Sequence, residues 1–115
     1  MPADLVGLVL VDLDAGRRTL VVCPGTIAEL RATFDQVLAA AQASDRFGDA
    51  LRWRISAGNE SIELPAGGWV KFRSRRQSVR GMTADVVLIP RDAGDQLLAE
   101  AQPCVMASRG EVLRW

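Results

Sequence analysis

The chain has 115 residues, and its fourteen basic and fourteen acidic side chains cancel to a formal net charge of zero. The hydrophobic fraction of 49% and the charged fraction of 24% are typical of a globular domain and exclude the low-hydrophobicity, high-charge composition of disordered chains. Balanced charge leaves no global field that would draw the whole protein to nucleic acid or to an acidic membrane. We therefore expect residues 1–115 to form a single domain, in which any polyanion binding comes from a local patch.

The apolar segments are short. The longest run, Leu5–Val11, is far below the roughly 18 residues that span a bilayer. The acidic start of the chain also lacks the positive region of a signal peptide. These features predict a cytoplasmic protein with no membrane partner.

Cysteine and histidine usage narrows the chemistry. There is no histidine, and Cys23 and Cys104 are the only cysteines, which excludes the usual zinc sites and every histidine-based catalytic triad. Two lone cysteines in a cytoplasmic protein are most often small buried hydrophobes. We predict that role for both.

The first 23 residues contain two apolar segments. Leu5–Val11 precedes a turn over 12–17 and a second segment, Thr19–Cys23. Periodicity alone does not assign so short an apolar run, so residues 3–14 are open between a strand, in a hairpin with 19–23, and a buried helix. The valine content slightly favours the strand.

A helix is predicted from Thr26 to about Ala43. Thr26 and Glu29 have the spacing of a capping box, in which the hydroxyl accepts an amide bond and the glutamate reaches back. Apolar residues then recur every three or four positions, as on the buried face of a helix that packs on a sheet. These residues are Ile27, Leu30, Phe34, Val37, Leu38 and Ala41.

From Arg52 the apolar period changes to two, which is the period of a strand. Turn residues at 57–59 and 65–68 divide this region into three segments. The pattern predicts a three-stranded meander. Its alternating apolar positions are Trp53, Ile55, Ile62, Leu64, Val70 and Phe72.

The last third of the chain reads as a strand, a helix and a final strand. Asp85–Ile89 is almost purely apolar, as in a strand buried on both faces of a parallel sheet, and Pro90 ends it. Asp92 is placed to cap a helix that Pro103 would stop. Residues 111–115 are predicted as an edge strand. The whole pattern indicates an α/β fold.

The segment Trp69–Ile89 resembles part of the large-subunit ATPase core of phage terminases. It has a strand that ends in an aromatic residue and arginines, then Ser78-Val-Arg-Gly81, then an aspartate-led apolar strand like the family's Walker B strand. Residues 17–24 and the following helix are similar to the strand and helix after the family's phosphate loop, and residues 3–14 would match the end of the phosphate-loop helix.

This resemblance covers roughly residues 5–115. It implies a phage protein in the host cytoplasm, with a partial P-loop-NTPase-like sheet, flanking helices and a β-meander. The nucleotide-binding motifs themselves are missing. No Gly-x-x-x-x-Gly-Lys-Ser/Thr sequence exists, and the only lysine is Lys71, on a predicted strand. The Walker B strand should end in Asp-Glu, but Ile89 is followed by Pro90, Arg91 and Asp92. We therefore predict no ATPase activity, no cofactor and no metal.

The candidate site is the segment 71–80, which carries five cations and no acid. One interpretation is that these side chains bind phosphates of a nucleic acid or an acidic protein surface, with the first three on one strand face. The other is a solvated strand face paired with Glu60, Glu63 and Asp85, each pair contributing about 0–1 kcal/mol. The five cations are Lys71, Arg73, Arg75, Arg76 and Arg80.

Tryptophans and closely spaced aspartates give further candidates. All three tryptophans are candidates to stack on nucleic-acid bases. Trp53 and Trp69 lie in alternating patterns that favour core packing, whereas Trp115 is open between a partner contact and a frayed end. Neighbouring carboxylates can bind magnesium, but turn and cap roles explain these aspartates more simply. The four are Asp12, Asp14, Asp92 and Asp95.

Three functions follow from these features. The first is a noncatalytic phage-derived protein that docks on a protein partner or forms a homodimer, because the open edges of a truncated sheet invite pairing. The alternative is a small nucleic-acid-binding protein that uses segment 71–80, with nonspecific affinity for the backbone. The third, an enzyme fragment completed by a second chain, has the least support because the Walker B carboxylates would still be missing.

Overall fold

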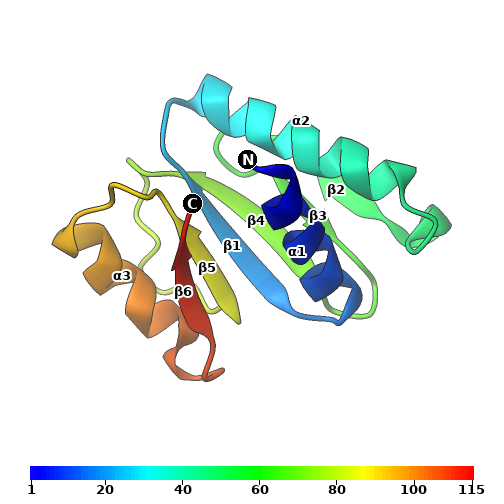
Figure 1. Ribbon diagram of the computed structural model, residues 1–115. Helices are drawn as coiled ribbons and strands as arrows, with labels where there is room; N and C mark the ends of the chain where they lie inside the picture. Colours follow the sequence, from blue (N-terminus) through cyan, green and yellow to red (C-terminus); the bar gives the residue numbers. More distant parts are fainter.

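A computed structural model describes all 115 residues and shows an α/β fold, as predicted, with a mixed six-stranded sheet and three α-helices (Figure 1). The strand order is β2-β3-β4-β1-β5-β6. The helices are α1 (Ala3–Asp14), α2 (Ile27–Ala43) and α3 (Asp95–Met106), with a short 3-10 turn, η1 (Gly48–Ala50). The strands are β1 (Arg18–Cys23), β2 (Arg52–Arg54), β3 (Ser61–Glu63), β4 (Trp69–Ser74), β5 (Val86–Ile89) and β6 (Glu111–Arg114).

The sheet has a parallel part and an antiparallel part. Strands β4, β1, β5 and β6 run parallel, and β1 lies between β4 and β5. Strands β2, β3 and β4 form an antiparallel meander, which confirms that prediction. The fully buried strand β5 has a parallel neighbour on each side, as its apolar sequence predicts.

The first segment of the chain is a helix, so the slightly favoured strand and its hairpin are wrong. Val6 and Val9 of α1 are buried against the core, while Leu8 and Val11 remain 43% and 50% exposed. Three-residue spacing of the buried side chains is helical, and the valine content obscured it. A hairpin is also excluded because β1 is paired on both sides.

Helices α1 and α2 together cover one side of the sheet (Figure 1). Helix α2 begins after Thr26, whose side-chain oxygen accepts a bond from the Glu29 N–H at 3.3 Å, so this half of the predicted capping box is confirmed. The Glu29 side chain does not bond back to the Thr26 N–H, so the other half is wrong. Its buried face packs Phe34 edge-on against Phe72 of β4, with ring centroids 5.4 Å apart. Burying aromatic rings of this size contributes about 1.5–3 kcal/mol each.

The other side of the sheet is covered only in part. Helix α3 packs on β5 and β6, and Val79 from the β4–β5 connection packs on Leu20 and Val22 of β1. No helix lies over β2, β3 and β4 on this side. The meander therefore presents one open face.

Helix α3 differs at both ends from its prediction. Its N-cap is Gly94, without a side-chain cap bond, and Asp92 instead forms an ion pair with Arg75 at 3.1 Å. Pro103 lies inside the helix, which runs to Met106. The proline removes the N–H that would bond the carbonyl of Ala99, and its ring crowds that carbonyl. Because Ala99 is exposed, the carbonyl can turn toward water. The predicted edge strand is confirmed as β6.

Both cysteines are free and buried, as predicted, with 0% of Cys23 and 2% of Cys104 exposed. None of the helices has the length and apolar character needed to cross a bilayer.

Candidate functional site

The open side of the meander gathers cations from two strands. Arg54 pairs with Ser61, Ser61 pairs with Lys71, and Lys71 lies beside Leu20 of β1, whose side chain faces α3. Paired residues in a sheet point to the same side, and every second residue of a strand does so. Four cations therefore share this side. We call them the basic face: Arg52, Arg54, Lys71 and Arg73.

The basic face has no carboxylate partners. None of its four cations forms an ion pair. The six ion pairs of the protein are all made by other arginines. Among the meander residues on the same side, the only acid is Glu63. Arg52 and Arg54 are exposed, and Lys71 and Arg73 are half-buried. Like charges held this close concentrate positive potential on one surface.

Lys71 lies over a tryptophan of its own strand. Its ammonium nitrogen is 4.4 Å from the centroid of the Trp69 ring, a cation–π contact worth about 0.5–1 kcal/mol at an exposed site. Trp69 is half-buried and packs against the core under α3, as predicted. The ring therefore fixes the direction of Lys71 and is itself covered by it.

Trp53 does not have the core position predicted for it. It pairs with Ile62 and so faces the opposite side of the sheet from the basic face, yet 46% of it is exposed. The reason is that β2 is an edge strand, while α2 packs over β4 and β1. The alternating pattern predicted correctly which side of the sheet Trp53 faces, but it did not predict that so much of this side chain stays exposed.

Arg73 lies near a buried acid. Burial lowers the pKa of the Arg73 guanidinium, and the nearby Glu60 carboxylate opposes that shift. Glu60 is 1% exposed, and neither of its carboxylate oxygens has a hydrogen-bond partner. Arg73 also donates to the carbonyl of Phe72 at 3.0 Å. An arginine remains protonated at neutral pH, so this end of the basic face keeps its charge.

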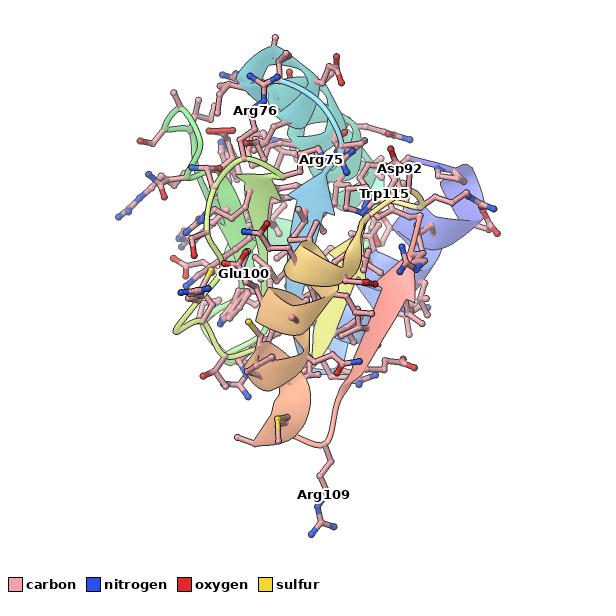
Figure 2. All side chains as sticks on the ribbon, turned by 90° about the vertical axis from the view of Figure 1, so that its left-hand side faces the viewer. Arg75, Arg76, Asp92, Glu100, Arg109 and Trp115 are labelled. Atoms are coloured by element: carbon pink, nitrogen blue, oxygen red, sulfur yellow. The ribbon has the colours of Figure 1, made fainter.

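The three remaining cations of segment 71–80 lie away from the sheet face. Arg75, Arg76 and Arg80 line an open hollow of about 610 Å³ at the carboxyl ends of β4 and β5, beside the start of α3. Arg75 pairs with Asp92 at 3.1 Å, and Arg80 pairs with Glu100 at 3.4 Å. Figure 2 shows Arg75, Arg76 and Asp92 at one end of the molecule and Arg109 at the other. Of the three, only Arg76 has no carboxylate partner.

The ion pairs proposed as the alternative role of segment 71–80 are wrong in their partners. Asp85 pairs with Arg18, whose side-chain and backbone N–H groups both donate to it, at 3.2 and 2.8 Å. Burial opposes ionisation of Asp85, but these bonds keep its pKa below the ordinary value. Glu60 and Glu63 form no ion pair either, so the cations of the strand are not neutralised.

The other candidate residues have structural contacts. The carboxylates of Asp12 and Asp14 pair with Arg17 and Arg46, at 3.2 and 3.7 Å. Nowhere do three or more histidine, cysteine, aspartate or glutamate side chains converge as metal ligands. The Trp115 indole N–H donates to the carbonyl of Val22 at 3.1 Å and its ring packs against the core, so this residue is held in place.

Arg52 and Arg54 are the cations that sequence reasoning missed. They alternate with Trp53 in the first strand of the predicted meander, which is the same spacing that Lys71 and Arg73 have in the third. The alternating pattern within each strand could therefore have identified each pair of arginine or lysine side chains as lying on one side of its strand. Only the register shows that both pairs face the same side.

Comparisons with protein-family models, with curated proteins and with solved structures find no match for this chain. The terminase resemblance of residues 69–89 and the P-loop-NTPase-like fold therefore stay predictions. The basic face and the adjoining hollow are the features from which a function can be argued.

Proposed function

We propose that the protein is a noncatalytic binding protein whose basic face holds the backbone of a single-stranded nucleic acid. The observation that supports this is the group of four cations on the side of the meander that no helix covers, without carboxylate partners. Arginine is suited to this ligand because its planar donor fork matches the oxygens of a phosphate.

The shape of the face favours a flexible strand over a duplex. Neighbouring strands lie about 4.8 Å apart, and side chains two residues apart on a strand are separated by about 7 Å. Strand β3 lies between β2 and β4, so the two pairs of cations are about 10 Å apart across the sheet, and a single strand can follow them by adjusting its backbone. Arg76 would extend the track beyond the end of β4 into the hollow.

Backbone contacts should dominate over contacts to bases. Proteins that bind single strands often stack bases on exposed aromatic rings. Here the ring of Trp69 is half-buried and covered by the Lys71 ammonium, and Trp53 faces the other side of the sheet. We therefore expect weak dependence on base sequence and strong dependence on salt.

The test is fluorescence anisotropy of a labelled oligothymidine at about 50 mM salt. We expect Lys71→Gln/Arg73→Gln and Arg52→Gln/Arg54→Gln each to weaken binding about 5- to 30-fold, because two exposed contacts of about 0.5–1 kcal/mol are lost. The matched control, Arg31→Gln/Arg109→Gln, removes two charges from α2 and from beyond α3. It should bind as the unmodified protein does. Equal losses in all three variants, or no binding by the unmodified protein, would refute the proposal.

A noncatalytic phage-derived protein that acts through a protein partner is the second candidate. It is supported by the two outer edges of the sheet, at β2 and β6, where backbone groups have no strand partner. Light scattering on a sizing column, with and without DNA, separates the candidates. A discrete dimer that ignores DNA favours the protein partner, while a monomer whose mass rises with DNA only at low salt favours the basic face.

The terminase interpretation proposes a partial P-loop-NTPase-like sheet without nucleotide hydrolysis. Four adjacent parallel strands with helices on both sides support the fold. The residues that follow the carboxyl end of β5 support the absence of nucleotide hydrolysis. Arg91 stands where a magnesium ligand would be expected, and the carboxylate of Asp92 is occupied by Arg75. An ATPase assay with the purified protein tests this point, and metal-dependent turnover would contradict it.

A further inference from the structure

Strand β2 has two chemically different sides. All three of its residues are exposed, and its outer edge faces no other strand. Arg52 and Arg54 point to the side of the basic face, while Trp53 points to the opposite side. Ile55 continues the alternation just beyond the strand, and 51% of it is exposed. The edge is therefore cationic on one side and apolar on the other.

The backbone of Trp53 faces outward from the sheet. On β3 the even-numbered residues bond toward β4, as the bonds Phe72 N–H to Glu60 C=O (3.0 Å) and Leu64 N–H to Gly68 C=O (2.9 Å) show. Bonds alternate along an antiparallel strand, so Ser61 and Glu63 bond toward β2 and engage its two arginines. The N–H and C=O of Trp53 are left pointing away from the sheet.

We infer that the β2 edge binds an extended peptide of alternating acidic and apolar residues, added to the sheet as a further strand. The outward N–H and C=O of Trp53 would bond to the peptide backbone, as in other cases of strand addition. Acidic side chains would lie beside Arg52 and Arg54, and apolar ones would cover Trp53 and Ile55. Complementary charge and the exposed apolar pair thus select the same alternating sequence.

Antiparallel pairing of β2 with the β2 strand of a second copy is disfavoured by the same arginines. In any antiparallel pairing of β2 with a second β2, residues that face each other point to the same side of the joined sheet. Arg52 or Arg54 of one copy would then lie opposite Arg52 or Arg54 of the other. Like charges directly opposite each other destabilise a strand pair. Arginines on an edge strand also protect it from self-association.

This inference does not rest on the nucleic-acid proposal. Trp53 lies on the opposite side from the basic face, and a nucleic acid has no backbone amide ladder that would pair with the edge. Substitution of Trp53 should therefore leave oligothymidine binding unchanged. Loss of one activity can be told apart from loss of the other.

The first test measures binding of a labelled, capped glutamate-valine alternating peptide of about eight residues. Trp53→Ala removes the apolar contact, and Trp53→Pro also removes the outward N–H. Proline is tolerated where the N–H of an edge strand faces solvent, so the pairing of β2 with β3 should survive. We expect the proline variant to bind at least about fivefold more weakly than the alanine variant, and an alternating lysine-valine peptide not to bind.

The second test uses the unmodified protein and so does not depend on how the variants fold. Hydrogen exchange at the Trp53 amide, followed by NMR, should slow when the glutamate-valine peptide is added and should not change with oligothymidine. The inference is wrong if the alanine and proline variants bind equally, if the lysine-valine peptide binds as well, or if the peptide leaves this amide unprotected. Protection by oligothymidine instead would also overturn it, since the edge would then contact nucleic acid.

Discussion

The salt dependence of nucleic-acid binding should change by a calculable amount when two residues of the basic face are replaced. Of the cations without carboxylate partners, five lie on the proposed nucleic-acid track, namely the four of the basic face and Arg76. Each contact to a single strand contributes about −0.7 to the slope of log affinity against log salt. The unmodified protein should therefore have a slope of about −3.5. Lys71→Gln/Arg73→Gln should have a slope of about −2.1.

These slopes correspond to clearly different losses of affinity. Between about 50 and 200 mM salt, the unmodified protein should lose roughly 100-fold in affinity and the double variant roughly 20-fold. The slope counts the ions released and does not depend on how tightly each variant binds at one salt concentration. It therefore separates a loss of phosphate contacts from a general loss of fold.

The assay is oligothymidine anisotropy at four salt concentrations between these limits, with Arg31→Gln/Arg109→Gln as the control of equal charge change. The control should keep the slope of about −3.5. Two results would refute the reasoning. One is a double-variant slope equal to that of the unmodified protein. The other is an unmodified slope shallower than about −1, which would mean that the cations of the sheet do not contact phosphates.

Four further predictions concern residues that support this arrangement. Asp85→Asn should lower the free energy of unfolding by about 1 kcal/mol at neutral pH. Burial opposes ionisation of Asp85, but its bonds to Arg18 keep the folded pKa below the ordinary value, so this contribution is complete above pH of about 4 and is lost as pH falls through the folded pKa. Urea titrations should therefore show a larger difference at pH 7 than at pH 3, and an equal difference at both would contradict the reasoning. Glu60→Met should raise the free energy of unfolding by about 1–3 kcal/mol, since it removes a buried carboxylate without hydrogen-bond partners. A free energy of unfolding below that of the unmodified protein would show that this acid is stabilised by contacts such as its attraction to the basic face. Gly110→Ala should cost about 1–3 kcal/mol in a urea titration, because the added Cβ would overlap the backbone carbonyl of Asp85; no loss would mean that this turn can shift. Burial raises the pKa of the Cys23 thiol to about 12, so iodoacetamide at pH 8 should modify it only in the unfolded protein, and rapid modification of the folded protein would contradict the buried position.

The elements that could be predicted from sequence have strong local signals. Helix α2 has a cap at Thr26 and a long apolar period, and the meander has turn residues between alternating strands. Helix α1 lacks such a signal, because the apolar run that contains its buried face continues onto its exposed face. The pairing of β1 with β4 and β5 leaves no place beside β1 for a strand at 3–14, and this pairing is a tertiary property.

The site was predictable only in part for a similar reason. Lys71 and Arg73 could be predicted as site residues from charge alone, but their position on the same face as Arg52 and Arg54 depends on strand register. Arg75 was expected to continue the strand face. Instead the chain turns after Ser74, whose N–H donates to the Gln77 side chain at 2.8 Å. That side chain donates in turn to the carbonyl of Gly58 at 3.1 Å, which fixes the turn against the preceding loop. A contact between such distant segments leaves no mark in the local sequence.

The open face itself follows from the way the chain crosses the sheet. Both helices that precede the meander lie on one side, and α3 returns the chain to β6 on the other, so no helix packs on the second side of the meander. An uncovered sheet would expose apolar surface, and here long cationic side chains reduce that exposure, since Lys71 lies over Trp69 and Arg73 is half-buried. Such side chains can shield apolar surface with their stems while their charges stay in water. Alanine substitutions would remove both properties together. Glutamine keeps much of the stem and removes the charge, so it is the substitution that tests binding with the least effect on the sheet.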